Sequence, residues 1–306
     1  MLGIAAVLLL LVALGGYLYA RSIFNRIERV EVSQSLTSAS SGTNYLIVGS
    51  DSRENVSEEG DAGFNGAEAP GGQRADTMML LHLEGGKAQM LSIPRDLYLP
   101  ISGTDGSSKI NAAYNADLGG GPTRLIDTIS ESLGIPIDRY MEVDFVSFAG
   151  LVDGLGGITI EFEHPAQDTE SGLYVPEAGE VELDGEQALA YVRSRHYTEM
   201  IDGQYVEDPT GDLGRIERQQ KFLSVVIEEL SSNKNPFSLA SAADGMAKGL
   251  RIDDEMSMFD AMRFAWGMRG LAEPLEPLTV SNDRNASGAV LILDEAASAA
   301  TLEQVR

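Results

Sequence analysis

The sequence contains no cysteine, so disulfide bonds, thiolate nucleophiles and cysteine-ligated zinc are excluded. Positive charge is also scarce: 22 lysines and arginines stand against 47 aspartates and glutamates in 306 residues, which gives a formal net charge of −25. Nucleic-acid binding relies on lysine and arginine to neutralise phosphates. We therefore expect no nucleic-acid partner.

Several catalytic motifs are missing as well. The three histidines, His82, His164 and His196, show no metal-ligand spacing, which argues against a zinc site. The sequence has neither the G-x-S-x-G motif of serine hydrolases nor the G-x-x-x-x-G-K-[ST] loop of nucleotide-binding proteins. Neither serine hydrolysis nor nucleoside triphosphate hydrolysis is indicated.

The first residues form a long run without charge. Residues 2–20, LGIAAVLLLLVALGGYLYA, are mostly apolar and, at about 1.5 Å per helical residue, long enough to cross about 30 Å of hydrocarbon. We predict a retained membrane anchor and favour it over a cleaved leader or a buried core helix. The positive-inside rule opposes an external domain, because Arg21, Arg26 and Arg29 directly follow the run.

The remainder alternates strand and helix patterns. Predicted strands cover 45–48, 78–83, 88–93, 158–162 and 289–293; predicted helices cover 122–133, 145–153, a short stretch after Asp184, 215–230, 236–250 and 255–271. Such interleaving predicts an α/β or α+β layered domain. We therefore expect an anchor at 1–20, a linker at 21–43 and one main domain at 44–306.

Four of the few cations lie close together at Arg193, Arg195, Arg215 and Arg218. On an extended segment, Arg193 and Arg195 would project from one face. Arg215 and Arg218 are three apart in the first turn of a predicted helix, where the helix dipole favours an anion over a cation. Together the four predict a phosphate site, whereas each arginine alone is better explained by a surface ion pair with Glu199, Glu207 or Glu217.

Two aspartates are placed to complement these cations. Asp51 ends a predicted strand and Asp76 begins the next, so both are expected at one edge of a sheet. Carboxylate oxygens together with substrate phosphates suit Mg²⁺. The alternative is an Asx turn at Asp51 and a cap or an ion pair with Arg74 at Asp76. Arg95 and Lys109 are further cations that we expect near this edge.

Seven segments carry a resemblance to a known family. They are YLIVGSDSR, RADTMMLLHL, MLSIPRDLYLPI, KINAAYNADLGG, VDFVSFAGLVDGLGGITI, LDGEQALAYVRSRH and GDLGRIERQQKFL, in this order from 45 to 223. They resemble the LytR-CpsA-Psr family of cell-envelope phosphotransferases. The resemblance implies an α/β/α sandwich around a central mixed sheet, with a hydrophobic prenyl-binding pocket, after one transmembrane helix.

The resemblance also implies a function. The expected enzyme is an extracytoplasmic, single-pass protein of the cell membrane that moves a glycopolymer from a polyprenyl-diphosphate carrier onto peptidoglycan through a phosphodiester link. The alternatives are hydrolysis of the carrier diphosphate and a non-catalytic envelope regulator that binds polyprenyl phosphates. The long segments 54–73 and 196–211 depart from the family pattern and leave the glycan and the acceptor undetermined.

The family motifs assign roles to single residues. Asp51 and Asp76 would hold Mg²⁺, with Mn²⁺ as an alternative, and would form the catalytic group with Arg95, Arg193 and Arg195. The diphosphate ligands would be Arg74, Arg95, Lys109, Arg193, Arg195, Arg215, Arg218 and Gln219, supported by Asp212. The prenyl pocket would be lined by Phe145, Phe148, Leu151, Phe222 and Val226, for each of which core packing is the competing explanation.

Overall fold

The computed structural model describes residues 14–50, 75–209, 212–233, 235–268, 275, 278–285 and 288–306. They divide into two compact units. The first, here called the sheet unit, contains the described residues of 28–50, 75–144 and 250–306. The second, here called the inserted unit, contains 14–27 and the described residues of 145–249. The chain therefore leaves the sheet unit after Asp144 and returns to it at Leu250.

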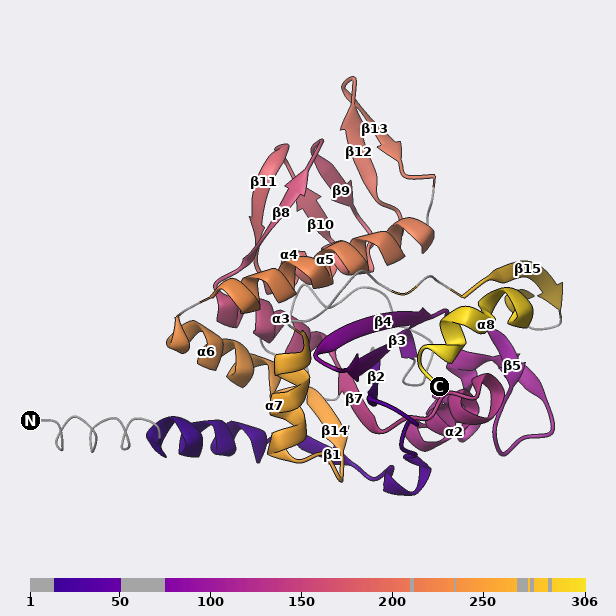
Figure 1. Ribbon diagram of the computed structural model, residues 1–306. Coiled ribbons are helices and arrows are strands. Elements are labelled where there is room, and N and C mark those ends of the chain that lie inside the picture. The colour runs from indigo at the N-terminus through magenta and orange to yellow at the C-terminus, as the bar shows by residue number, and fades with distance from the viewer. Residues whose placement is uncertain are drawn as a thin grey trace, which may run out of the picture. The chain divides into compact units, whose positions relative to one another are not determined.

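The sheet unit is built on a six-stranded mixed sheet (Figure 1). Its strand order is β1 (Glu28–Val30), β14 (Leu250–Asp253), β7 (Arg139–Val143), β2 (Thr43–Ser50), β3 (Ala75–Glu84) and β4 (Lys87–Ile93). The β1–β14 and β7–β2 pairs are parallel, and the other three pairs are antiparallel. The predicted central mixed sheet is thus confirmed.

Alternation along the strands gives this sheet two apolar faces. Leu46 and its cross-strand partner Leu80 belong to the core that also contains Leu125 and Ile129 of α2 (Pro122–Leu133). Tyr45 lies on the opposite face, where its ring is 5.1 Å from that of Phe264 in α7 (Met258–Gly267). Helices therefore cover both faces of the sheet.

Smaller elements complete the sheet unit. They are the 3₁₀ turns η1 (Ser33–Ser35), η3 (Ile110–Ala113) and η4 (Ala116–Leu118), the hairpins β5 (Tyr98–Pro100) with β6 (Ser107–Lys109) and β15 (Val280–Asn285) with β16 (Gly288–Leu293), and the helix α8 (Glu295–Glu303). The predicted helix at 122–133 coincides with α2, which starts at Pro122 and ends before Gly134 in the left-handed conformation.

The inserted unit has its own core and its own small sheets. Its elements are α3 (Phe145–Leu155), the ribbon of β8 (Ile158–Phe162) and β11 (Gly179–Leu183), a four-stranded sheet in the order β10 (Leu173–Val175), β9 (Ala166–Asp168), β12 (Thr198–Ile201) and β13 (Gln204–Glu207), and the helices α4 (Gly185–Arg193), α5 (Asp212–Ser232) and α6 (Pro236–Met246). The backbones of α3 and α6 approach at Gly150 and Gly245, where a Cβ on either residue would collide with the other. The short helix predicted after Asp184 is α4, and the Asp184 side chain caps it by accepting the Gln187 N–H.

The predicted anchor is only partly covered by the described residues. Residues 14–24 are helical, and residues 2–13 lie outside the described part of the chain. Within the described ranges, no helix combines the length and the apolar character that crossing a membrane requires.

Candidate functional site

The C-terminal end of β2 meets the N-terminal end of β3. Gly49 pairs with Thr77 and Ser50 pairs with Ala75, so Asp76 is an extra residue at a β-bulge. Asp51 directly follows Ser50 in sequence, but Asp51 and Arg74 lie outside the described residues, as does the long segment 54–73. The register confirms that the two strand ends meet. The metal-binding role of Asp51 and Asp76 stays a prediction.

A buried polar network lies beside this strand end. Burial, and next the charge of Glu142, raise the pKa of Tyr114, whose buried hydroxyl lies close to Glu142, Tyr140 and Ser50. Glu142 is fully buried in β7 and also accepts hydrogen bonds from the Tyr140 hydroxyl at 3.2 Å and from Arg251 Nη1 at 3.1 Å. The network lies beside Ser50, the residue that precedes Asp51. Glu142, Tyr114 and Arg251 were not among the site residues predicted from the sequence.

Arg95 and Lys109 are brought together by an aspartate between them. Lys109 Nζ lies 2.8 Å from Asp96 Oδ1, and Arg95 Nε lies 3.6 Å from Asp96 Oδ2. The backbone supports this geometry, because Lys109 pairs with Tyr98 and the Asn111 N–H donates to the Arg95 carbonyl at 3.3 Å. The two cations therefore lie close to each other, and their expected place near the edge that carries Asp51 and Asp76 stays a prediction. Asp96, which holds both, was not among the predicted site residues.

Asp168 organises the segment that carries Arg193 and Arg195. Its side chain is 1% exposed, and its Oδ2 accepts the Ser194 hydroxyl at 2.6 Å and the N–H groups of Arg195 and His196 at 3.0 Å each. Its Oδ1 accepts the N–H groups of Glu170 at 2.9 Å and Ser171 at 3.2 Å. Burial opposes ionisation, but these donors outweigh burial and lower the pKa of Asp168. Asp168 is therefore ionised, and its carboxylate fixes residues 194–196 through these hydrogen bonds.

The two arginines are not arranged as the sequence predicts. Arg193 is the last residue of α4 rather than part of an extended segment, and the chain extends only from Ser194. The prediction of one extended face is therefore wrong, because the helix started by Asp184 continues through Arg193. Both arginine side chains are exposed, while Ser194 between them is fully buried. The hydroxyl of Ser194 fixes the segment and leaves the flanking guanidinium groups at the surface.

Arg218 serves the interior of the inserted unit. It is 7% exposed; its Nη2 donates to the Ser194 carbonyl at 2.8 Å, and its Nη1 donates to Asp208 at 3.1 Å. Its guanidinium also lies 4.6 Å from the centre of the Tyr197 ring. These contacts make Arg218 a structural support of the 194–197 segment. Diphosphate binding by Arg218 stays a prediction.

The helix that carries Arg215 and Arg218 starts earlier than predicted. It begins at Asp212, so Arg218 lies in its second turn and the prediction of a shared first turn is wrong. Arg215 is buried, at 6% exposed. Gln219 donates to the Val192 carbonyl at 3.2 Å and thereby connects this helix to the end of α4. The backbone of Asp212 forms the first position of the helix, and its supporting role stays a prediction.

The predicted prenyl-pocket residues lie in or against the core of the inserted unit. Phe222 and Val226 are 5% and 3% exposed in that core, and Phe148 and Leu151 pack against it. The rings of Phe148 and Phe222 stack with their centres 4.6 Å apart. These contacts agree with the competing explanation, which is ordinary core packing. The side chain of Phe145 lies outside the described part of the structure. The lipid role of these residues stays a prediction.

Carboxylates also surround the residue after Arg195. His196 Nδ1 lies 3.0 Å from Glu207, and its Nε2 lies 3.4 Å from Glu170. The hydrogen bond with Glu207, and next the charge of Glu170, raise the pKa of His196. Among the described residues, no three histidine, aspartate or glutamate side chains are grouped in a way that would hold a metal ion. Asp51 and the side chain of Asp76 lie outside the described part of the structure.

With this geometry in place, the comparisons define the class of protein. The model of the LytR_cpsA_psr family matches residues 13–304, and the chain belongs to this family. The family predicted from the seven sequence segments is confirmed.

Individual relatives agree with the family match. The "Probable cell wall biosynthesis protein LcpB" of Corynebacterium glutamicum is 33% identical over 294 residues, which cover 94% of this chain and 66% of LcpB. The "Polyisoprenyl-teichoic acid--peptidoglycan teichoic acid transferase TagU" of Oceanobacillus iheyensis is 30% identical over 283 residues, which cover 85% of this chain and 78% of TagU. The chain thus spans just under two thirds of LcpB.

A solved structure shares the fold. The "LytR-Csp2A-Psr enzyme from Actinomyces oris" matches this chain with a TM-score of 0.70 and a sequence identity of 23%. The match covers 91% of this chain and 95% of the Actinomyces oris chain. At this level of identity, the likeness supports the mixed α/β fold alone.

Proposed function

We propose that this chain transfers a glycopolymer from a polyprenyl-diphosphate carrier to peptidoglycan. The observation that carries the proposal is the Asp168 cluster, which places two exposed arginines on either side of a buried, fixed serine in a chain of net charge −25. Guanidinium groups bind phosphate oxygens with directed hydrogen bonds. Membership of the family and the transferase name of TagU support the same reaction.

The chemistry of the transfer fits a site of this composition. An acceptor hydroxyl forms a new bond to the phosphorus that carries the glycan, and the bond from that phosphorus to the prenyl phosphate breaks. Negative charge grows on the phosphate oxygens, and Arg193 and Arg195 would stabilise it electrostatically. The hydroxyl proton would pass to a carboxylate, for which Asp51 and Asp76 are the candidates.

A divalent cation belongs to the proposal. The Gly49–Thr77 and Ser50–Ala75 pairing brings the ends of β2 and β3 together, which fits a shared ligand site for Asp51 and Asp76. Bound Mg²⁺ would neutralise phosphate charge. Arg95 and Lys109, held by Asp96, would bind further phosphate oxygens. The chain would act outside the cytoplasm, tethered by residues 1–20.

The decisive experiment follows the phosphate. The full chain is supplied with a lipid-linked glycan donor that is labelled in the sugar-linked phosphate, with and without peptidoglycan. We expect label to join peptidoglycan through a phosphodiester and to remain on lipid when peptidoglycan is omitted. Release of soluble sugar phosphate under both conditions would instead show a hydrolase, and binding without turnover would show a regulator.

A further inference from the structure

The helix α7 presents an apolar stripe to solvent. Phe259, Met262 and Trp266 are 73%, 60% and 72% exposed. Their spacing of three and four residues places them on one face of the helix. Large apolar side chains grouped in this way mark an interaction surface rather than scattered surface residues.

The opposite face of α7 is firmly packed, so the exposed stripe is a property of the folded state. Phe264 contacts Tyr45, and Gly267 lies against Leu83 so closely that a Cβ there would collide with it. Ser257 and Asp260 form a complete capping box at the start of the helix. The helix is thus fixed to the sheet with its apolar stripe pointing away.

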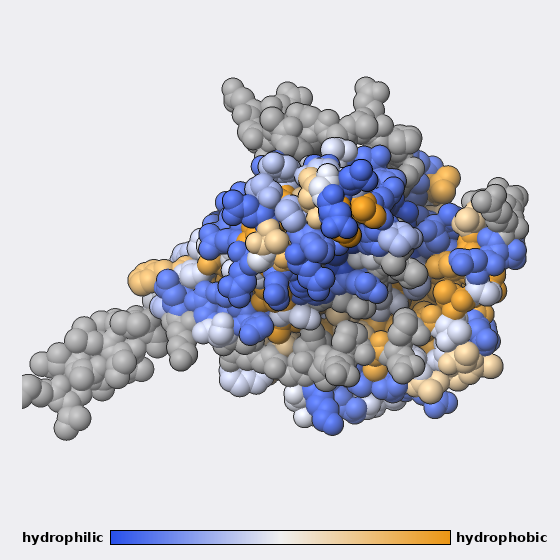
Figure 2. Space-filling view, turned by 90° about the horizontal axis from the view of Figure 1, so that it is seen from above, coloured by the Kyte–Doolittle hydropathy of each residue, from blue (hydrophilic) through white to orange (hydrophobic). Residues whose placement is uncertain are grey.

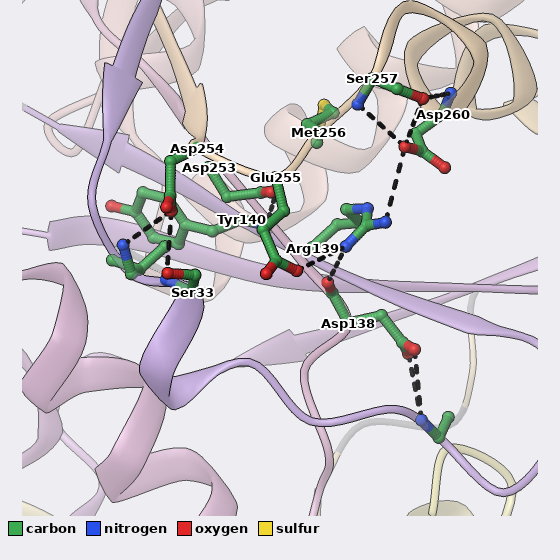
Figure 3. Close-up of polar contacts among 12 residues, drawn as sticks. Ser33, Asp138, Arg139, Tyr140, Asp253, Asp254, Glu255, Met256, Ser257 and Asp260 are labelled. Atoms are coloured by element: carbon green, nitrogen blue, oxygen red, sulfur yellow. Dashed lines mark hydrogen bonds and ion pairs between the residues drawn. The ribbon is translucent and has the colours of Figure 1, made fainter.

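The carboxylates near the start of α7 contact backbone N–H groups, a hydroxyl and an arginine of neighbouring segments (Figure 3). Asp254 accepts the N–H groups of Val32 and Ser33 at 3.1 Å each. Asp260 accepts the Ser257 hydroxyl at 2.6 Å and lies 3.5 Å from Arg139, which also lies 4.0 Å from Glu255. Arg263 is the only basic residue of α7 and is exposed. The stripe is therefore flanked by a cation in a chain that is acidic overall. On the one face that Figure 2 shows, hydrophilic residues predominate over one part and hydrophobic residues gather over another.

Chain connectivity ties α7 to the predicted anchor. β1 pairs with β14, the strand that leads into α7, and Arg29 donates to the carbonyls of Asp253 and Met256 at 3.1 and 2.6 Å. Glu28, the first residue of β1, follows the predicted span 2–20 by eight residues. Eight residues reach at most about 28 Å. If 2–20 spans a bilayer, the start of β1 lies within about 28 Å of its surface, and the β14–α7 connection lies beside β1.

From these observations we infer that the Phe259–Met262–Trp266 stripe docks on the lipid surface of the membrane that holds the anchor. Tryptophan and phenylalanine are favoured at the boundary between acyl chains and headgroups, and Arg263 would face headgroup phosphates. A second copy of this chain is a poorer occupant, because two chains of net charge −25 repel each other. The inference goes beyond the proposed transfer and does not depend on it, but it does rest on the predicted anchor.

The sole tryptophan of the chain makes the test direct. The full chain is reconstituted into phosphatidylcholine vesicles with and without phosphatidylglycerol, and the fluorescence of Trp266 is recorded. We expect quenching by lipids brominated near the headgroup, protection from aqueous iodide, and an emission maximum at shorter wavelength than that of free tryptophan. Full access to iodide without lipid quenching would overturn the inference.

Two variants sharpen the measurement. The double variant Phe259→Ser/Met262→Ser should lose most of the lipid quenching and gain access to iodide. The matched control is Phe237→Ser in α6, which removes a phenylalanine that is 84% exposed and should change neither signal. Protection from iodide without lipid quenching would mean that a second copy of the chain covers the stripe. Failure of the chain to float with vesicles would remove the anchor on which the inference rests. Either result contradicts docking, and neither depends on transfer activity.

Discussion

Two buried carboxylates, one in each unit, show opposite electrostatic behaviour. Asp168 in the inserted unit is 1% exposed and Asp253 in the sheet unit is fully buried. The pKa of Asp168 is lowered, because five donors contact its two oxygens and outweigh burial. The pKa of Asp253 is raised, because burial outweighs its few backbone contacts. The donors around a carboxylate, more than its depth, decide its charge.

The surroundings of Asp253 show why burial wins there. Its Oδ2 accepts the Tyr140 N–H at 3.0 Å, whereas its Oδ1 is buried without a hydrogen-bond partner among the described residues. Figure 3 shows Asp253 beside Tyr140, with the neighbouring Asp254 directed at Ser33. Asp168 thus holds the 194–196 segment of the candidate site as a charged group, whereas burial favours the neutral form of Asp253.

Removing Asp168 should have the largest effect on stability. We expect Asp168→Ala to lower the free energy of unfolding by roughly 3–5 kcal/mol, since each buried donor left without an acceptor costs about 1–3 kcal/mol. Urea denaturation measures the loss. The control Glu180→Ala removes an exposed carboxylate of β11 and should stay within about 0.5 kcal/mol. Equal effects of the two changes would contradict the organising role of Asp168.

The same residue makes a prediction for pH. A lowered folded-state pKa stabilises the fold above the unfolded value of about 3.9, and this stability is lost as pH falls through the folded pKa. The difference between the wild-type chain and Asp168→Asn should therefore be full near neutral pH and shrink below about pH 4. A difference that grows on acidification would reverse the assigned sign.

The exposed arginines should affect activity rather than stability. We expect Arg193→Ala and Arg195→Ala each to slow transfer by about 10²–10³, as loss of one charge-stabilising donor does. Stability should change by less than about 1 kcal/mol, because both side chains lie at the surface. Rates are measured with the lipid-linked donor and peptidoglycan, and Lys87→Ala at the start of β4 is the control for a lost surface cation. Parental rates would remove these residues from the site.

Arg218 should show the opposite balance. Arg218→Lys keeps the charge but loses the fork that contacts Asp208 and the Ser194 carbonyl. We expect a loss of about 1–3 kcal/mol in urea denaturation, together with slower transfer because the 194–197 segment loosens. Unchanged stability with slow transfer would instead assign Arg218 directly to the phosphate.

Asp253 should give the smallest change. A raised folded-state pKa means that its stabilising contribution is complete below about pH 3.9 and is lost as pH rises through the folded value. Asp253→Asn avoids that loss and still accepts the Tyr140 N–H, so we expect stability at pH 7 to be equal or higher by up to about 1 kcal/mol. The gain should disappear near pH 4 in thermal denaturation. A large loss at pH 7 would show that the anion is needed.

Local patterns predicted most of the regular elements. The helix at 122–133 and the strand at 158–162 coincide with α2 and β8, because their signals, a proline start, a glycine end and strict alternation, lie within the segment. Predictions were weaker at helix ends. The predicted helix at 255–271 is α7 (Met258–Gly267), and β15 was not predicted at all.

The composition of the candidate site was also predictable in part. The motifs drew attention to Arg95, Lys109, Arg193 and Arg195 because cations are rare in this chain. They did not reveal Asp168, which lies in an unremarkable AQD strand and contacts residues 26–28 positions away. The donors to Asp168 at Ser194, Arg195 and His196 follow α4, whereas Asp168 ends β9. The sequence around Asp168 therefore gives no signal of these contacts.

The sequence by itself determined the acidity, the missing metal and nucleophile motifs, the strand and helix cores and the family. Each of these depends on residue types or on spacing within a short window. Only the tertiary structure decided that Arg218 supports the protein's interior, that Asp168 holds the Ser194 segment and that Asp76 falls at a bulge. Those outcomes depend on strand register and on burial, and both arise when residues distant in the chain pack together.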